Sequence, residues 1–199
     1  MKNNQLKIKR IFDFILSLLL VVLLTPFWII VSLLICLDSQ GKPFFLQERL
    51  GLNGKKFKIY KFRTMVNNAE NLGDGLIVKN EGDSRITRVG RILRKTSLDE
   101  LPQLFNILKG EMSFVGPRPP VTYHPYNGYE SYSEKAKKRF DMLPGITGLA
   151  QVKKRNSATW DERIVIDVEY VDNFSIMLDC WILVHTVTAM LYKEEYTEL

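Results

Sequence analysis

The chain has 199 residues, which suits one domain with an appendage, and its net charge of +6 and isoelectric point near 9.2 make it basic. Such a balance points to nucleic acid, an anionic membrane surface or phosphorylated substrates as partners. The two cysteines, Cys36 and Cys180, exclude a disulfide framework and a cysteine-based metal cluster.

A long apolar run follows the basic N-terminus. No charged residue occurs from Phe14 to Leu37, and at about 1.5 Å per residue this run is long enough to cross a hydrocarbon core of about 30 Å. Pro26 lies at its middle and has no N–H to donate, so we predict a kink at Thr25–Pro26. Both flanks are basic, which favours placing both ends on one side of a membrane. We therefore expect a re-entrant helix over residues 1–40, with a straight spanning helix as the alternative, because spanning helices tolerate proline.

Short aromatic runs come next. Phe44–Leu46 and Phe57–Phe62 flank a glycine-containing turn at Gly51–Gly54, which predicts a β-hairpin. Residues 65–84 are rich in asparagine and glycine and indicate a loop that starts with a helical turn. Arginines then recur at every third position from Arg85 to Arg94, which places several of them on one helix face. For any one of them, a solvated surface position is the simpler interpretation.

The stretch around Pro102 has the apolar spacing of a helix. Proline is tolerated only in the first helical turn, so we expect this helix to begin near Leu98 or Asp99. Asp99 and Glu100 would then lie at the positive end of the helix dipole, which keeps carboxylates ionised and attracts anions. Taken alone, acidic residues in a first turn also fit ordinary capping, and Ser97-x-x-Glu100 matches a capping box.

Beyond this helix, Gly110 is a C-terminal stop signal. The prolines of Gly116–Pro120 stiffen a segment that would hold Arg118 in place for a bidentate phosphate contact, although a proline-rich turn with a solvated arginine is the alternative. We expect a basic helix over Ser133–Met142, in solvent or at a lipid surface. A turn-rich element spans Pro144–Val152, where glycines permit close backbone approach or simply tight turns.

The C-terminal region has the pattern of two helices. The first is expected over Trp160–Tyr170 and the second over Ser175–Tyr192. The second is rich in Ile, Leu and Val, which fits packing on the core or lying on a membrane.

Together these motifs resemble the bacterial sugar transferase family, small monotopic phosphoglycosyl transferases that act on polyprenyl phosphate. The matching stretches occur in the family's order and cover essentially the whole chain. They are Lys61-Phe-Arg-Thr-Met65, Arg94, Ser97-Leu-Asp-Glu-Leu-Pro-Gln-Leu-Phe-Asn106, Gly116-Pro-Arg-Pro119, Pro144-Gly-Ile-Thr-Gly148 with Ala150-Gln151, Arg155-Asn156, Trp160, and Asp167 with Tyr170-Val171. The chain departs from the family in having Thr25 where serine is frequent, and Leu149 where tryptophan is frequent.

The resemblance implies a two-step reaction. An aspartate attacks the β-phosphate of a UDP-sugar, releases UMP and carries the phosphosugar, which polyprenyl (undecaprenyl) phosphate then takes. The family's nucleophile corresponds to Asp99 and its partner carboxylate to Glu100. The resemblance also implies that Asp99 positions the Mg²⁺ ion. As a hypothesis, Glu100 orients the site or takes a proton from the lipid phosphate. The phosphate-binding candidates are Arg94, Arg118, Lys61 and Arg63, and the other site candidates are Asp167, Gln151 and Arg155.

The expected fold is α+β and mostly helical. Residues 1–40 would form a re-entrant membrane helix kinked at Thr25–Pro26, and residues 41–199 a compact cytoplasmic catalytic domain with a small β-hairpin and interfacial amphipathic helices. The expected partners are a UDP-sugar, polyprenyl phosphate and the cytoplasmic leaflet of a bacterial inner membrane, without nucleic acid. The reaction would be the first membrane step of a capsule, exopolysaccharide, O-antigen or glycoprotein pathway. Two alternatives stay open, a membrane-attached nucleotide- or lipid-binding module without catalysis and a structural subunit of a glycan assembly complex.

Overall fold

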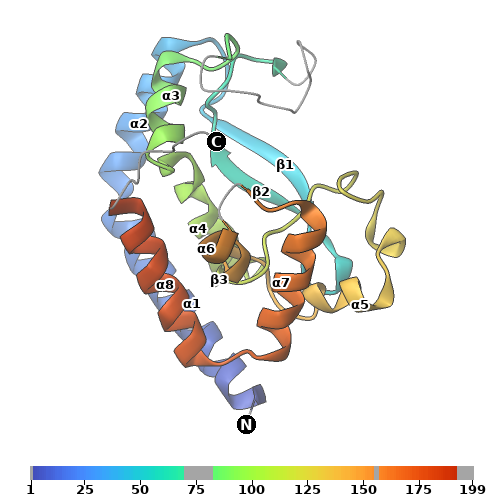
Figure 1. Cartoon of the computed structure of the whole chain (residues 1–199). Coiled ribbons are helices and arrows are strands. Elements are labelled where there is room, and N and C mark those ends of the chain that lie inside the picture. The colour runs from blue at the N-terminus through green and yellow to red at the C-terminus, as the bar shows by residue number, and fades with distance from the viewer. Residues whose placement is uncertain (1, 70–82, 155–156, 192–199) are drawn as a thin grey trace.

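A computed structural model describes residues 2–69, 83–154 and 157–191 of the chain, and its fold is α+β and mostly helical. Two helices come first, α1 (Lys2–Leu23) and α2 (Thr25–Asp38), which are bent relative to each other by 62° (Figure 1). The carbonyl of Val21 at this bend accepts hydrogen bonds from the Thr25 hydroxyl (3.1 Å) and the Trp28 indole (3.2 Å). Pro26, without an N–H, breaks the helix here, so the predicted kink is confirmed.

The bent pair has one buried face and one exposed apolar face. Trp28, Val31 and Ile35 of α2 are buried against the rest of the protein. In the described part of the chain, no single helix is both long and apolar enough to cross a membrane, whereas α1 and α2 together pass that test of length and composition. Large apolar side chains remain exposed along both helices, namely Ile8, Ile11, Phe12, Phe14, Ile15, Leu18, Leu19, Val22, Leu23, Ile29, Ile30, Leu33, Leu34 and Leu37.

The predicted hairpin is confirmed. Strands β1 (Phe44–Leu50) and β2 (Lys56–Phe62) pair antiparallel around a 3₁₀ turn, η1 (Leu52–Gly54). Their register pairs Phe45 with Lys61 and Arg49 with Phe57. Since directly paired residues share a face and side chains alternate along a strand, Arg49 and Lys61 lie on the same face of the hairpin.

The region around Pro102 differs in part from its prediction. Helix α3 (Arg88–Lys95) is followed by a 3₁₀ segment, η3 (Leu98–Gln103), and only then by α4 (Leu104–Lys109), which ends at the predicted Gly110 with φ +84°. The helical start at Leu98 is therefore correct, but Pro102 lies inside a 3₁₀ segment rather than in the first turn of an α-helix. The loop predicted for residues 65–84 lies largely outside the described residues.

A second, parallel two-stranded sheet was not predicted. Strand β3 (Ser113–Val115) pairs with β4 (Gly145–Thr147), which lies in the segment expected to be only turns. A Cβ on Gly145 would lie 2.1 Å from the backbone nitrogen of Gly116, so this close approach requires glycine. The chain turns back after β3, so that the carbonyl of Pro117 accepts a hydrogen bond from the N–H of Gly145 at the start of β4 (3.0 Å).

The remaining helices complete the C-terminal part of the domain (Figure 1). They are η4 (Tyr129–Ser131), α5 (Glu134–Lys137), η5 (Lys138–Phe140), α6 (Leu149–Lys154), α7 (Trp160–Asp172) and α8 (Ile176–Leu191). The two predicted C-terminal helices are confirmed as α7 and α8. The basic helix expected over Ser133–Met142 is much shorter, and its Arg139 is buried rather than at a surface.

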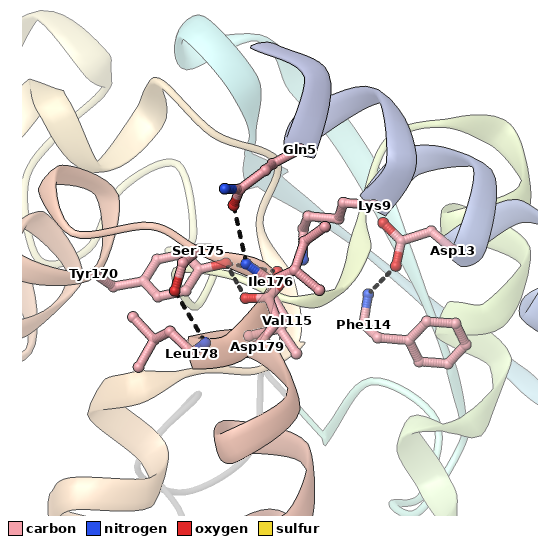
Figure 2. A network of polar contacts seen from close by, with 10 residues as sticks. All are labelled: Gln5, Lys9, Asp13, Phe114, Val115, Tyr170, Ser175, Ile176, Leu178 and Asp179. Atoms are coloured by element: carbon pink, nitrogen blue, oxygen red, sulfur yellow. Dashed lines mark hydrogen bonds and ion pairs between the residues drawn. The ribbon is translucent and has the colours of Figure 1, made fainter. Parts of the chain in front are cut away.

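A buried polar network joins α1 to the C-terminal helices (Figure 2). Lys9 pairs with the carboxylate of Asp179 on α8, which also accepts a hydrogen bond from the Tyr170 hydroxyl (2.7 Å). Further along α1, Asp13 accepts from the backbone N–H of Phe114 in β3 (3.2 Å). Because buried charges need such partners, this network ties the N-terminal half of α1 to β3 and to the C-terminal helices.

Candidate active site

Glu100 lies at the centre of a small recess between η3, the hairpin and the proline-rich segment. Its Oε1 is 2.6 Å from the Lys61 ammonium and 3.6 Å from Nη2 of Arg118. The side chains of Glu100 and Lys61 are only 21% and 17% exposed, so solvent screens their attraction poorly. Burial raises the pKa of Glu100, but Lys61, Arg118 and Arg49 outweigh it and lower this pKa from 4.5 to about 2.

Asp99, the neighbouring residue, has a different environment. Among the described residues it forms no ion pair, in contrast to Glu100. Burial raises its pKa, and the positive charges of Lys61 and Arg94 offset this rise only in part, while Glu100 adds to it. Burial therefore acts against the effect expected of the helix N-terminus, which favours an ionised Asp99, and desolvation is the larger of the two effects on this pKa in the free protein.

The capping box that Ser97-x-x-Glu100 matched, as an alternative explanation of the acidic pair, does not form. Ser97 has a left-handed backbone with φ +57°, and its side chain makes no capping hydrogen bond. Instead its backbone N–H donates to the carbonyl of Arg94 (3.2 Å), so Ser97 belongs to the turn that ends α3. This sharp turn directs η3 towards the hairpin and so brings Glu100 to Lys61.

Comparison with known proteins adds an independent observation. The family model described as bacterial sugar transferase matches residues 4–193. This chain belongs to the bacterial sugar transferase family. It is 41% identical over 188 residues to the uncharacterized sugar transferase EpsL of Bacillus subtilis, covering 94% of this chain and 89% of that protein.

Two further relatives of the sugar transferase have names that state a reaction. One is the UDP-glucose:undecaprenyl-phosphate glucose-1-phosphate transferase of Caulobacter vibrioides, 40% identical over 92% of this chain and 69% of that protein. The other is the undecaprenyl-phosphate galactose phosphotransferase of Salmonella typhimurium, 37% identical over 97% of this chain and 42% of that protein. The chain thus spans most of the first relative and less than half of the second.

The structure brings together some of the predicted site residues of this sugar transferase. Lys61, Glu100 and Arg118 meet in the recess, and Asp99 is the residue before Glu100 in the chain. Arg94 is exposed at the end of α3, near enough to Asp99 to affect its pKa.

Other predicted residues lie elsewhere. The structure does not bring Arg63 into the recess, because its buried guanidinium donates to the carbonyls of Ile35, Ser39, Gln40 and Gly41 at the end of α2. Gln151 donates to the carbonyl of Ile146 (2.9 Å) within its own segment, and Asp167 is buried against Arg139. Arg155 lies outside the described residues.

Arg49 is a residue of the recess that the sequence did not reveal. Its Nη1 donates to the carbonyl of Pro119 (3.0 Å) and its Nη2 to the Gln47 side chain (2.6 Å). Burial, and then the positive charge of Arg118, lower the pKa of Arg49 to about 10. Arg49 could have been found from its position on the same hairpin face as Lys61. That position is known only once the register of the two strands is known. Three cations thus surround the single carboxylate of Glu100, an arrangement that favours binding of a further anion.

The acidic residues can be tested for their fit to Mg²⁺. Among the described residues, no three His, Cys, Asp or Glu side chains come together as a metal-binding group. Mg²⁺ does not require such a group, since it commonly binds one or two carboxylates together with substrate phosphates and water. Asp99 fits this mode, because its carboxylate has no cationic partner at ion-pair distance among the described residues.

Proposed function

We propose that this sugar transferase moves a phosphosugar from a UDP-sugar to undecaprenyl phosphate. An oxygen of Asp99 forms a bond to the β-phosphorus, and the bond from that phosphorus to the bridging oxygen breaks, so that UMP leaves. An oxygen of the lipid phosphate then bonds to the same phosphorus, the Asp99–phosphorus bond breaks, and polyprenyl diphosphate sugar is released. The observation that carries this proposal is a carboxylate, Asp99, that forms no ion pair among the described residues and lies beside a recess with three cations in a chain of this family.

The charges around Glu100 support distinct roles for the two carboxylates. Lys61, Arg118 and Arg49 would neutralise the diphosphate, which otherwise repels the nucleophile. A general base works best when its pKa is near the operating pH, so a pKa of about 2 argues against proton abstraction by Glu100. Of the two hypotheses from the sequence, we keep the one in which Glu100 orients the cations.

Asp99, together with substrate phosphate oxygens, would hold Mg²⁺, which supplies neutralisation of charge on the diphosphate. The relatives' names, such as exopolysaccharide production protein PSS of Rhizobium leguminosarum, support a place in polysaccharide assembly. We place the chain at the step that loads the lipid carrier with its first sugar.

The decisive measurement is release of UMP by the purified full chain in detergent. With Mg²⁺ and a panel of UDP-sugars, we expect one equivalent of UMP without lipid, an intact-protein mass increased by one phosphosugar, and sustained release once undecaprenyl phosphate is added. EDTA should suppress all three signals. A protein that binds a UDP-sugar without releasing UMP from any member of the panel would be a binding module and would overturn the proposal.

We further propose that α1 and α2 form a re-entrant helix in the cytoplasmic leaflet, with residues 41–199 as the cytoplasmic catalytic domain. The 62° bend, the exposed apolar faces and the basic residues at both ends support this topology. Exposed apolar side chains on α8, Met177, Trp181, Val184 and Val187, fit an additional contact with lipid.

The topology predicts that both ends of the bent pair face the cytoplasm. In a chain with Cys36 and Cys180 replaced by serine, single cysteines at the exposed positions Asn4 and Lys42 should both resist a membrane-impermeant maleimide in intact cells and react in lysed cells. Labelling of one position alone in intact cells would instead show a spanning helix.

A further inference from the structure

The segment that carries Arg118 is held by contacts from three separate parts of the protein. Pro117, Pro119 and Pro120 have no N–H, so the segment has few backbone donors with which to form its own turn. Its four consecutive carbonyls accept instead from three other elements, β4, η5 and β1. Pro117 accepts from the N–H of Gly145 (3.0 Å), Arg118 from Arg139 Nη2 (2.8 Å), Pro119 from Arg49 Nη1 (3.0 Å) and Pro120 from the N–H of Leu50 (3.0 Å).

The contact on Arg118 itself comes from a buried ion pair. Arg139 of η5 and Asp167 of α7 have side chains that are 0% and 1% exposed, and Arg139 Nη2 lies 2.5 Å from Asp167 Oδ2. The same Nη2 donates to the Arg118 carbonyl. The Arg139 guanidinium also lies over the rings of Phe140 and Trp160, at 5.4 and 5.9 Å from their centroids. The two rings and the carboxylate together restrict the orientation of this guanidinium.

This pair is a poor device for stability alone. Nε and Nη1 of Arg139 have no hydrogen-bond partner among the described residues, although both are buried. Removing charges from water is costly, and a buried ion pair recovers that cost only when its remaining donors are also satisfied. The buried Arg139 is better explained by a role in holding the Arg118 carbonyl, to which its Nη2 donates.

We infer that Asp167 and Arg139 are positioning residues, which fix the backbone of Arg118 so that its guanidinium faces Glu100 and the substrate diphosphate. The expected effect on the reaction rate rests on the proposed function, whereas the expected effect on the order of the Arg118 segment does not. It gives Asp167 a role at a distance from the reacting atoms, since neither Asp167 nor Arg139 lines the recess. Arg163 and Arg118 also face the Asp167 carboxylate, so removing its charge acts on a locally basic region.

The kinetic test is a double-mutant cycle between Asp167 and Arg118. Asp167→Asn keeps the size of the side chain and should lower kcat/KM for the UDP-sugar about 10- to 100-fold, as expected for a displaced catalytic arginine. In an Arg118→Met background the same change should alter kcat/KM by less than about 3-fold, because it acts through Arg118. Equal effects of Asp167→Asn in both backgrounds would overturn the inference. Asp172→Asn is the matched control, since Asp172 lies on the same helix in an exposed pair with Lys138 and should leave the kinetics unchanged.

A second readout does not depend on activity. Between residues 116 and 121 only Gly116, Arg118 and Val121 carry a backbone N–H, and amide exchange of a peptide covering them reports the order of the segment. Asp167→Asn should accelerate this exchange and Asp172→Asn should not. Unchanged exchange in Asp167→Asn overturns the inference, whereas absence of UMP release by the unaltered protein overturns only the proposed function. If Asp167→Asn does not fold, Arg139→Lys, which keeps the charge but not the fork of donors, is tested in the same way.

Discussion

Asp99→Asn should abolish UMP release, by more than about 10³-fold, because a neutral amide cannot form the bond to phosphorus. The variant should remain folded and at least as stable as the unaltered protein. Burial raises the pKa of Asp99, so its ionised carboxylate is less favourable in the folded protein than in the unfolded protein, and replacement by an amide removes that cost. Intact-protein mass should show no phosphosugar adduct.

The experiment needs three measurements on each protein: UMP release, intact mass after incubation with a UDP-sugar, and thermal unfolding. Asp141→Asn is a suitable control, because Asp141 is exposed and lies outside the recess. An Asp99→Asn protein that releases UMP at a near-normal rate would remove Asp99 as the nucleophile. An inactive variant with a strongly lowered melting temperature would instead attribute the loss to misfolding.

Glu100→Gln should lower kcat by about 10²- to 10³-fold while KM for the UDP-sugar stays equal or falls. The change removes the carboxylate that forms ion pairs with Lys61 and Arg118, yet leaves the recess more positive for a diphosphate. With a pKa of about 2, Glu100 is ionised throughout the neutral range. The rates of both proteins should therefore follow parallel pH profiles from about pH 5 to 8. If the rate of the unaltered protein falls on one side of this pH range and the rate of Glu100→Gln does not, Glu100 acts as a general base.

The same pKa predicts a pH dependence of stability. The carboxyl of Glu100 has a lower pKa in the folded protein, about 2, than its ordinary value of 4.5. Its contribution to the free energy of unfolding is therefore complete above about pH 4.5 and is lost as the pH falls towards 2. The free energies of unfolding of the unaltered protein and of Glu100→Gln, measured in urea, should differ most above pH 4.5 and converge in acid. Glu48→Gln, which alters an exposed pair with Lys56 at 3.9 Å, should show no such difference.

Several features of this protein follow from local chemistry and are readable from the sequence. Pro26 breaks the apolar run because it lacks an N–H, Gly110 ends α4 because it adopts a left-handed backbone, and the aromatic runs around Gly51–Gly54 pair across a short turn. Each depends on residues within a few positions of one another. The ordered motifs likewise indicated the family that the comparison confirmed.

The roles of the charged residues were decided by contacts between distant parts of the chain. Arg63 and Arg118 look equivalent in the sequence, yet one caps α2 and the other faces Glu100. Arg139 belongs to a basic stretch, yet it is buried because its charge is paired with Asp167. That residue is 28 positions later in the chain and beside Arg139 in space. The parallel pairing of β3 with β4 is similarly non-local. Propensity and capping act over one or two turns, whereas burial, charge pairing and the resulting pKa values depend on which elements pack together, and only the tertiary structure contains that information.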